Sequence, residues 1–251
     1  MHRFFLGKSD LVLDQVILIN ESETLKHLKL SLRVKLSESI ELISDQFTYI
    51  CQIQSIEEDQ ITTKIQSKES HSNETSSTID LFQCVPKGTK LELILQKNVE
   101  LGVKKFYLVD SKRCVADYTG KDISKKIMRF ERIIKEAAKQ SKRDIVPEIE
   151  GPYTLKDVSK KIDTYDVFLV LYENEESTSI GEKLNALKSI NSGKLKIGIL
   201  VGPEGGLEPY EVDDLQANGA FSVSLGKRIL RTETAGFTAV TIAQYIMGEF
   251  E

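Results

Sequence analysis

The chain has few of the residues that build disulfides and structural metal sites. Among 251 residues there are three cysteines and three histidines, and no tryptophan. Cys51, Cys84 and Cys114 are odd in number and far apart, so they form neither a disulfide framework nor a CxxC motif. We therefore expect no bound metal and a reducing compartment, which predicts a cytoplasmic location.

Long hydrophobic runs are also lacking. No stretch approaches the roughly 20 apolar residues that span a bilayer. The apolar part of residues 1–7 is too short for a secretory signal. We therefore expect no association with membranes. A length of 251 residues suits one large domain and one small domain.

Positive charge is concentrated in one part of the chain. The net charge is −4 at pH 7, yet residues 96–146 contain 14 Lys or Arg against 7 Asp or Glu. This stretch thus carries +7 and the remainder −11. A basic segment within an acidic chain is typical of a phosphate-facing surface. A solvated helix face with mixed charges is the alternative.

The first part of the chain, to about residue 66, predicts a small β-rich module. Val16–Ile19 is an apolar run, and residues 39–43 and 49–53 alternate with the period of a strand. Residues 23–32 predict a short helix. The segment 67–78 has no apolar residue and predicts an exposed loop. We therefore predict two domains, with boundaries 1–70 and 71–251.

Beyond this loop, strand and helix patterns alternate. Apolar side chains recur at helical spacing in two segments, and the chain closes with a third predicted helix: residues 91–99, 123–141 and Thr232–Met247. Three continuous apolar runs have the character of strands buried in a parallel sheet: residues 106–109, 167–172 and 197–201. This alternation predicts an α/β domain with a parallel sheet.

A glycine-rich turn, Gly-Pro-Glu-Gly-Gly at 202–206, follows the last of these runs directly. Ligands of open α/β sheets bind at the carboxyl ends of strands, and glycine lets the backbone approach them closely. Glu204 can accept hydrogen bonds from ribose hydroxyls, from an amine or from the backbone. The spacing matches neither GxGxxG nor a P-loop, which disfavours a dinucleotide site. A plain strand-to-helix turn without a ligand is the alternative.

A second glycine turn lies about twenty residues further on. Residues 224–235 read Ser-Leu-Gly-Lys-Arg-Ile-Leu-Arg-Thr-Glu-Thr-Ala, so a strand again ends near a glycine and leads into a helix that Thr232 can cap. Three apolar side chains there can line an aromatic base, and two arginines can bind an anion: Leu225, Ile229, Leu230, Arg228 and Arg231. A capped helix with surface arginines is the alternative.

Together the two turns resemble the cofactor region of the SPOUT class of RNA methyltransferases, which use S-adenosylmethionine (SAM). The chain is most similar to the RsmE family, which methylates N3 of a uridine in 16S ribosomal RNA. The similarity continues over nearly the whole chain, in residues 1–5, 27–33, 96–103, 111–114 and 136–143. One departure is Ser31, where the family commonly has valine.

This resemblance implies a small PUA-like β-barrel followed by a SPOUT-type parallel-sheet domain with a C-terminal trefoil knot. It also implies SAM as the methyl donor, no metal, a homodimer with the site near the subunit interface, and 16S ribosomal RNA or the small ribosomal subunit as partner. The residues expected to bind the cofactor are Leu171, Gly202, Glu204, Gly205, Gly206, Leu225, Gly226, Ile229, Leu230 and Thr234, and Tyr172 is expected to help close the pocket.

Uridine N3 carries a proton and is a poor nucleophile until that proton is lost, so its methylation requires the enzyme to favour deprotonation. We expect Arg231 to stabilise the uridine anion through O2 or O4, although it can equally hold a phosphate. Glu204 is the candidate base, ranked above Glu233, because a glutamate in a helix's first turn is usually a capping partner. RNA contacts are expected from Arg3, Arg33, Arg113, Gln140, Arg143 and Arg228.

Two other functions stay open at this point. One is a SPOUT methyltransferase that acts on another RNA, such as tRNA. The other is a catalytically inactive protein that still binds SAM and RNA. The glycines of both turns and Arg231 are present, so nothing in the residues favours the loss of catalysis.

Overall fold

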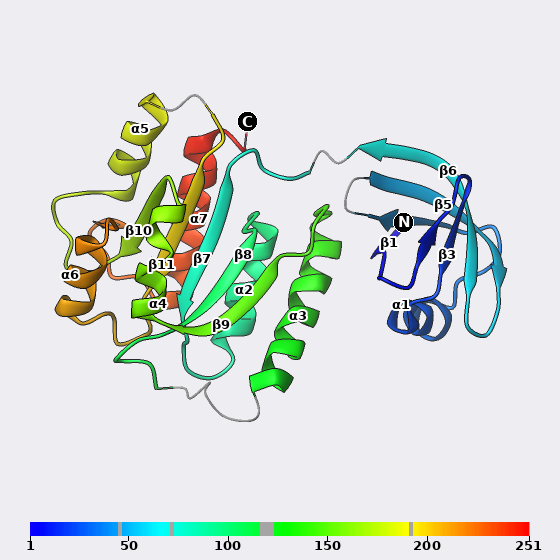
Figure 1. Ribbon diagram of the computed structural model, residues 1–251, viewed down its shortest axis with the longest axis horizontal. Coiled ribbons are helices and arrows are strands. Elements are labelled where there is room, and N and C mark those ends of the chain that lie inside the picture. The colour runs from blue at the N-terminus through cyan, green and yellow to red at the C-terminus, as the bar shows by residue number, and fades with distance from the viewer. Residues whose placement is uncertain (45–46, 71–72, 116–122, 191–192, 251) are drawn as a thin grey trace. The chain divides into compact units, whose positions relative to one another are not determined.

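The computed structural model describes residues 1–44, 47–70, 73–115, 123–190 and 193–250, and its chain forms two compact units (Figure 1). Unit 1 comprises Met1–Glu74 and Lys139–Ile145, and unit 2 comprises Thr75–Ala138 and Val146–Glu251. Unit 1 thus includes a short segment that is distant in sequence. The predicted domain boundary between residues 70 and 71 stays a prediction.

Unit 1 is a curled six-stranded sheet with the order β1-β4-β5-β6-β3-β2. Its neighbouring strands are antiparallel, except that β1 runs parallel to β4. The outer strands β1 and β2 are not paired with each other in the described part of the chain. The curled sheet is thus a half-barrel, in agreement with the PUA-like β-barrel unit expected. Its strands are β1 (His2–Phe5), β2 (Leu11–Val12), β3 (Val16–Ile19), β4 (Ser39–Ile43), β5 (Phe47–Ile56) and β6 (Ile61–Ser70).

The apolar side chains of unit 1 pack on one face of this sheet. Ile40 and Leu42 of β4 are fully buried there, as the period-two pattern of residues 39–43 predicts. Ile17 and Ile19 of β3 are buried with them. The predicted helix 23–32 lies in the expected place but in two parts, α1 (Ser22–Lys26) and a π-helical turn (His27–Leu32). The predicted loop 67–78 is wrong at its start, because residues 67–70 extend β6. Its residues 71–72 lie outside the described residues.

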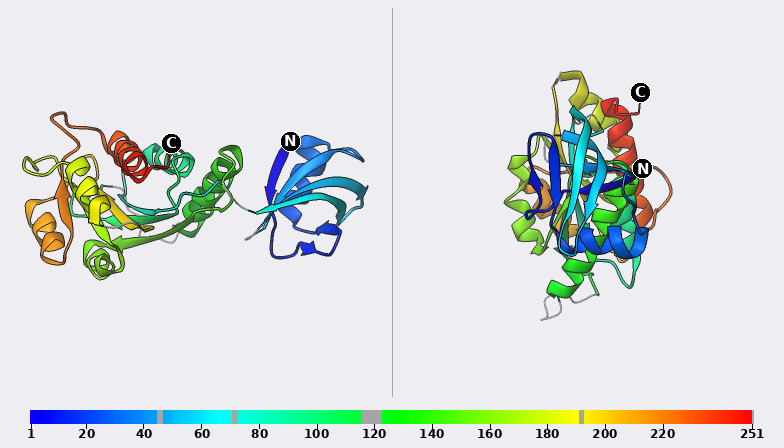
Figure 2. Two further views of the ribbon diagram at one scale, coloured as in Figure 1. Left: turned by 90° about the horizontal axis from the view of Figure 1, so that it is seen from above. Right: turned by 90° about the vertical axis from the view of Figure 1, so that its right-hand side faces the viewer.

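Unit 2 is built on a six-stranded sheet with the order β12-β10-β11-β7-β8-β9, in which every neighbouring pair is parallel. Helices cover both faces, α2 and α7 on one side and α4 and α6 on the other (Figure 2). The strands are β7 (Thr78–Cys84), β8 (Lys105–Asp110), β9 (Glu148–Thr154), β10 (Val167–Leu171), β11 (Lys196–Val201) and β12 (Phe221–Val223). The helices are α2 (Lys90–Glu100), α3 (Ile123–Gln140), α4 (Leu155–Ser159), α5 (Ile180–Ile190), α6 (Pro209–Ala217) and α7 (Thr232–Met247).

The predicted parallel α/β domain is therefore confirmed. The three apolar runs form β8, β10 and β11, and the three helical patterns form α2, α3 and α7. Elements that lack a continuous apolar run or a clear period, such as β9, were not predicted. Within the described residues, no helix is both long and apolar enough to cross a membrane.

Between β12 and α7 the chain crosses the edge of the sheet at which the parallel strands end. Strand β12 lies at the sheet edge beside β10, whereas α7 packs against β7 and β11. Residues 224–231 therefore return across the carboxyl ends of β10 and β11. The predicted trefoil knot depends on this crossover, which also brings residues 224–231 beside the 202–206 turn.

Candidate active site

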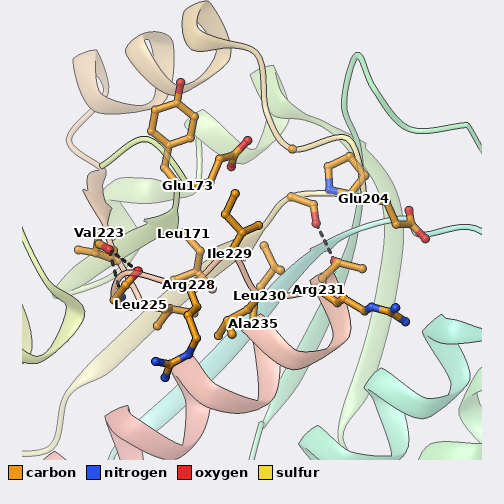
Figure 3. A pocket seen from close by; sticks show the side chains of 18 of the residues that line it. Leu171, Glu173, Glu204, Val223, Leu225, Arg228, Ile229, Leu230, Arg231 and Ala235 are labelled. Atoms are coloured by element: carbon orange, nitrogen blue, oxygen red, sulfur yellow. Dashed lines mark hydrogen bonds between the residues drawn. The ribbon is translucent and has the colours of Figure 1, made fainter. Parts of the chain in front are cut away.

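Three turns at the carboxyl ends of neighbouring strands enclose a cavity of about 570 Å³ (Figure 3). Residues 171–173 begin at the last residue of β10, residues 201–206 at the last residue of β11, and residues 223–232 at the last residue of β12. Lys90 of α2 and Ala235 of α7 complete the lining. The size is typical of a small-molecule site, and the position is where open α/β sheets bind their ligands.

The predicted cofactor residues converge on this cavity although they come from three separate turns. Those that line it are Leu171, Gly202, Glu204, Gly205, Gly206, Leu225, Gly226, Ile229 and Leu230, together with Tyr172, Arg228 and Arg231. Thr234 is not among the described residues that line it. The sequence interpretation missed Lys90 and Glu173. Glu173 follows an apolar strand directly, which is a usable signal, whereas nothing around Lys90 marks it.

The 202–206 turn is held in a shape that requires glycine. The Gly206 N–H donates to the Pro203 carbonyl oxygen at 2.9 Å, and Gly206 has φ +71°. Residues with a Cβ rarely adopt this backbone conformation. A Cβ at Gly206 would also meet the carboxylate of Glu173, so the space between Glu173 and the turn depends on the missing side chain.

Arg113, which does not line the cavity, makes a hydrogen bond to the same turn. Its Nη1 donates to the Gly205 carbonyl oxygen at 2.6 Å, and its Nε and Nη2 donate to the two carboxylate oxygens of Glu208 at 3.0 and 2.8 Å. Such a fork-to-carboxylate pair fixes geometry as well as charge. Arg113, predicted to contact RNA, thus has its donors directed at the turn. Its RNA contact stays a prediction.

Thr232 joins the two glycine turns. The structure has Arg231 at the N-cap of α7 and Thr232 as the first helical residue, so the prediction that Thr232 caps the helix is wrong. The Thr232 hydroxyl donates instead to the Gly202 carbonyl oxygen at 2.7 Å and accepts from Gln83 Nε2 at 3.0 Å. The residue is buried. It therefore connects α7 to β11 and β7 at the wall of the cavity.

Glu204 is held as a carboxylate. It accepts hydrogen bonds from Lys90 Nζ at 2.8 Å and from the Lys87 backbone N–H at 3.1 Å. Partial burial acts to raise the pKa of Glu204, but Lys90 and the backbone N–H groups outweigh it, so the pKa is lowered. The lower pKa makes Glu204 a weaker proton acceptor than an ordinary glutamate. Lys90 Nζ also lies 3.8 Å from a carboxylate oxygen of Glu233.

Two arginines at the cavity present their charge to solvent. Arg228 and Arg231 are exposed, and neither guanidinium group makes a hydrogen bond or ion pair with another residue in the described ranges. Figure 3 shows Arg231 on the side of Glu204 and Arg228 on the other side. Both guanidinium groups are thus available to an anionic ligand.

The four residues of unit 1 that are expected to bind RNA differ in their surroundings. Arg3 is buried, with Nη2 at 2.7 Å from Asp144 and Nη1 at 3.3 Å from Glu41. Arg143 is also buried, and its Nη2 lies 2.6 Å from Glu74. Both therefore have structural partners within this unit. The other two, Arg33 and Gln140, are exposed. For all four, RNA contact stays a prediction.

The chain matches the model of the RNA methyltransferase domain over residues 73–244. It is 34% identical over 204 residues to ribosomal RNA small subunit methyltransferase E of Bacillus subtilis (strain 168), covering 80% of this chain and 78% of the relative. It is 30% identical over 241 residues to the protein of that name from Mesomycoplasma hyopneumoniae (strain 232), covering 96% and 98%.

Among solved structures, the chain resembles a ribosomal RNA small subunit methyltransferase E from Neisseria gonorrhoeae bound to S-adenosyl methionine. The TM-score is 0.85 and the identity 29%, with 100% of both chains covered. Fold and site together define an RNA methyltransferase of the SPOUT class with a PUA-like N-terminal unit. Within that class, the chain belongs to the ribosomal RNA small subunit methyltransferase E family.

Proposed function

We propose that this chain transfers a methyl group from SAM to N3 of a uridine in 16S ribosomal RNA of the small subunit. Family membership supports a SAM-dependent methyltransferase of ribosomal RNA. The observation that carries the proposal is the convergence of residues 171–173, 202–206 and 224–231 on one cavity with unpartnered arginines at its edge. The uridine N3 position is the finer part of the proposal.

The residues of the cavity fit SAM. Leu171, Leu225 and Leu230 supply apolar surface for an adenine ring, and the glycines of 202–206 let backbone groups approach the ribose. The sulfonium of SAM makes its methyl carbon electrophilic, which is the chemistry that the cofactor supplies. The task left to the protein is to hold the uridine in line with that methyl group and to favour loss of the N3 proton.

Arg231 is the residue proposed to favour that loss. Its guanidinium carries a fixed positive charge at the cavity and has no carboxylate partner within the described residues. A cation there stabilises the negative charge that spreads to O2 and O4 when N3 is deprotonated. Glu204 stays a candidate base, but its lowered pKa argues against that role. Its hydrogen bond to Lys90 supports a role in positioning that lysine beside the cavity.

RNA binding is assigned to exposed cations. Arg33 in unit 1 and Arg228 at the cavity are exposed, and phosphate contacts from such residues give salt-dependent affinity. We propose that the domain 1–70 binds RNA, that 71–251 carries catalysis, and that the protein is a cytoplasmic homodimer. The target uridine has to leave its base stack to enter the cavity.

The test is methylation of defined RNAs by the purified protein with SAM that carries a labelled methyl group. Small ribosomal subunits, free 16S ribosomal RNA and tRNA are compared, and labelled nucleosides are identified by mass spectrometry. We expect label in 16S RNA, as 3-methyluridine. Label in tRNA alone would support the tRNA alternative. SAM binding without transfer to any of these RNAs would support the inactive alternative.

A further inference from the structure

Glu173 places a carboxylate on the cavity wall, directly after β10. Glu173 lines the cavity (Figure 3). It lies beside Gly206, whose missing Cβ leaves room next to the carboxylate. In the described ranges, no residue makes a hydrogen bond or ion pair with the Glu173 side chain. The other carboxylate that lines the cavity, Glu204, is already bound by Lys90. Glu173 is therefore the carboxylate available to a cationic group of a ligand.

We infer that Glu173 binds the α-ammonium group of the methionine part of SAM. The inference rests on the proposed function, because it requires SAM in this cavity. An ammonium carries three N–H donors, and a carboxylate accepts them in short, charge-assisted hydrogen bonds.

The backbone of the glycine turn offers only neutral acceptors. Three of its carbonyl oxygens already accept one hydrogen bond each, that of Gly202 from Thr232, that of Pro203 from the Gly206 N–H, and that of Gly205 from Arg113. Among the carboxylates that line the cavity, Glu204 is paired with Lys90, so Glu173 is the one that offers an ammonium an unpaired negative charge. The guanidinium of Arg113 is a positive charge near Glu173, but its Nε and Nη2 already donate to the carboxylate of Glu208.

The sulfonium, the other cation of SAM, is a poorer partner for this carboxylate. It has no N–H donor, and it loses its positive charge as the methyl group leaves. A carboxylate beside it stabilises the reactant more than the transition state and slows the transfer. The ammonium keeps its charge throughout, so binding it strengthens SAM affinity and leaves the chemical step unchanged. Glu173 is thus a specificity residue for the amino-acid end of the cofactor.

The inference is tested with Glu173→Gln and three ligands in titration calorimetry. SAM and S-adenosylhomocysteine both carry the ammonium, but only SAM has the sulfonium. 5′-Methylthioadenosine has neither the amino-acid end nor a sulfonium. We expect roughly tenfold weaker binding of SAM and S-adenosylhomocysteine alike, and unchanged binding of 5′-methylthioadenosine.

Glu176→Gln is the matched control, because Glu176 is an exposed residue of the same loop that does not line the cavity. It should bind all three ligands normally. Equal binding by Glu173→Gln and the unmodified protein overturns the inference. A loss confined to SAM assigns Glu173 to the sulfonium, and a loss for all three ligands assigns it to the ribose or the turn. Both results overturn the ammonium assignment. Failure of the unmodified protein to bind SAM would instead overturn the proposed function.

Discussion

The hydroxyl of Thr232 donates to the carbonyl oxygen of Gly202 at 2.7 Å and so joins the first residue of α7 to the end of β11. Gln83 extends this contact to β7, since its Nε2 donates to the Thr232 hydroxyl at 3.0 Å and to the Cys84 carbonyl oxygen at 2.9 Å. The hydroxyl group therefore fixes how the walls 202–206 and 224–231 face each other across the cavity.

Thr232→Val keeps the shape of the side chain and removes the hydroxyl. The buried Gln83 amide and Gly202 carbonyl each lose a partner, so we expect the free energy of unfolding to fall by about 2 kcal/mol. SAM affinity falls as well, because the hydrogen bond that holds residues 224–231 beside the 202–206 turn is lost. Urea denaturation and calorimetry measure the two effects. Thr232→Ser restores the hydroxyl and should recover both, and normal SAM affinity in the valine variant would contradict the positioning role.

Arg231→Ala separates catalysis from cofactor binding. If Arg231 stabilises the uridine anion, methyl transfer falls by about a hundredfold or more, while the Kd for SAM changes by less than about threefold. Arg231→Lys retains the charge but loses the planar fork, and we expect an intermediate rate. Single-turnover transfer and calorimetry make the comparison. Equal losses of transfer and SAM affinity would show that Arg231 is a cofactor ligand.

Gly206→Ala tests whether the cavity depends on the missing Cβ. The substitution adds backbone strain at φ +71° and places a methyl group against the Glu173 carboxylate, so SAM binding should be lost or reduced at least tenfold. Gly219→Ala is the matched control. Gly219 also has a positive φ, +98°, but lies outside the cavity lining, and a Cβ there would lie 3.7 Å from the nearest atom, Cγ2 of Ile162. Gly219→Ala should lower the free energy of unfolding by a similar amount and leave SAM affinity unchanged.

Arg3 and Arg33 should respond in opposite ways. Arg3→Ala removes the buried ion pair between Arg3 and Asp144, and we expect a loss of about 3–5 kcal/mol in the stability of unit 1. Arg33→Ala removes an exposed charge. It should leave stability unchanged and weaken RNA binding. The slope of log affinity against log salt concentration should become shallower by the amount that about one phosphate contact contributes. Unchanged RNA affinity in a folded Arg33→Ala variant would remove Arg33 from the proposed RNA surface.

Cys114 should be the reactive thiol of the described chain. A hydrogen bond from the Cys84 thiol, aided by Ser111, lowers the pKa of Cys114 to about 6, against the effect of partial burial. Burial raises the pKa of Cys51 to about 11. Alkylation of native Cys114 by iodoacetamide should therefore rise with pH through about 6, where its thiolate forms. Peptide mapping at pH 7.5 should find Cys114 labelled and Cys51 unlabelled, and a midpoint near 9 would contradict the shift.

Local patterns located the turns that form the walls of the cavity. Apolar runs marked β10 and β11, and glycines marked the turns that follow β11 and β12. The family resemblance assigned Leu171, Gly202 and Gly226 to one site, and all three line the cavity. Parallel strands bring their carboxyl ends to the same edge, which explains why turns distant in sequence meet there.

The residues that depend on distant partners were not predictable in this way. Thr232 has the chemistry of a helix cap, but its hydroxyl bonds Gly202 thirty residues away in sequence, and a local propensity contains no such contact. The family resemblance suggested an RNA contact for Arg3, which stays a prediction, but the sequence did not indicate its buried partner Asp144 far along the chain. Lys90 reaches the cavity from α2 and likewise has no local signature.

The crossover of residues 224–231 has a consequence for the order in which the protein is made. A chain emerges from the ribosome amino end first, and contacts between distant residues form late because loop closure must precede them. A nascent chain that ends before β12 already contains the glycine turn 202–206 but not the opposite wall of the cavity or the Thr232 tie. Affinity for the cofactor therefore arises only after α7 has been synthesised and has packed against the sheet.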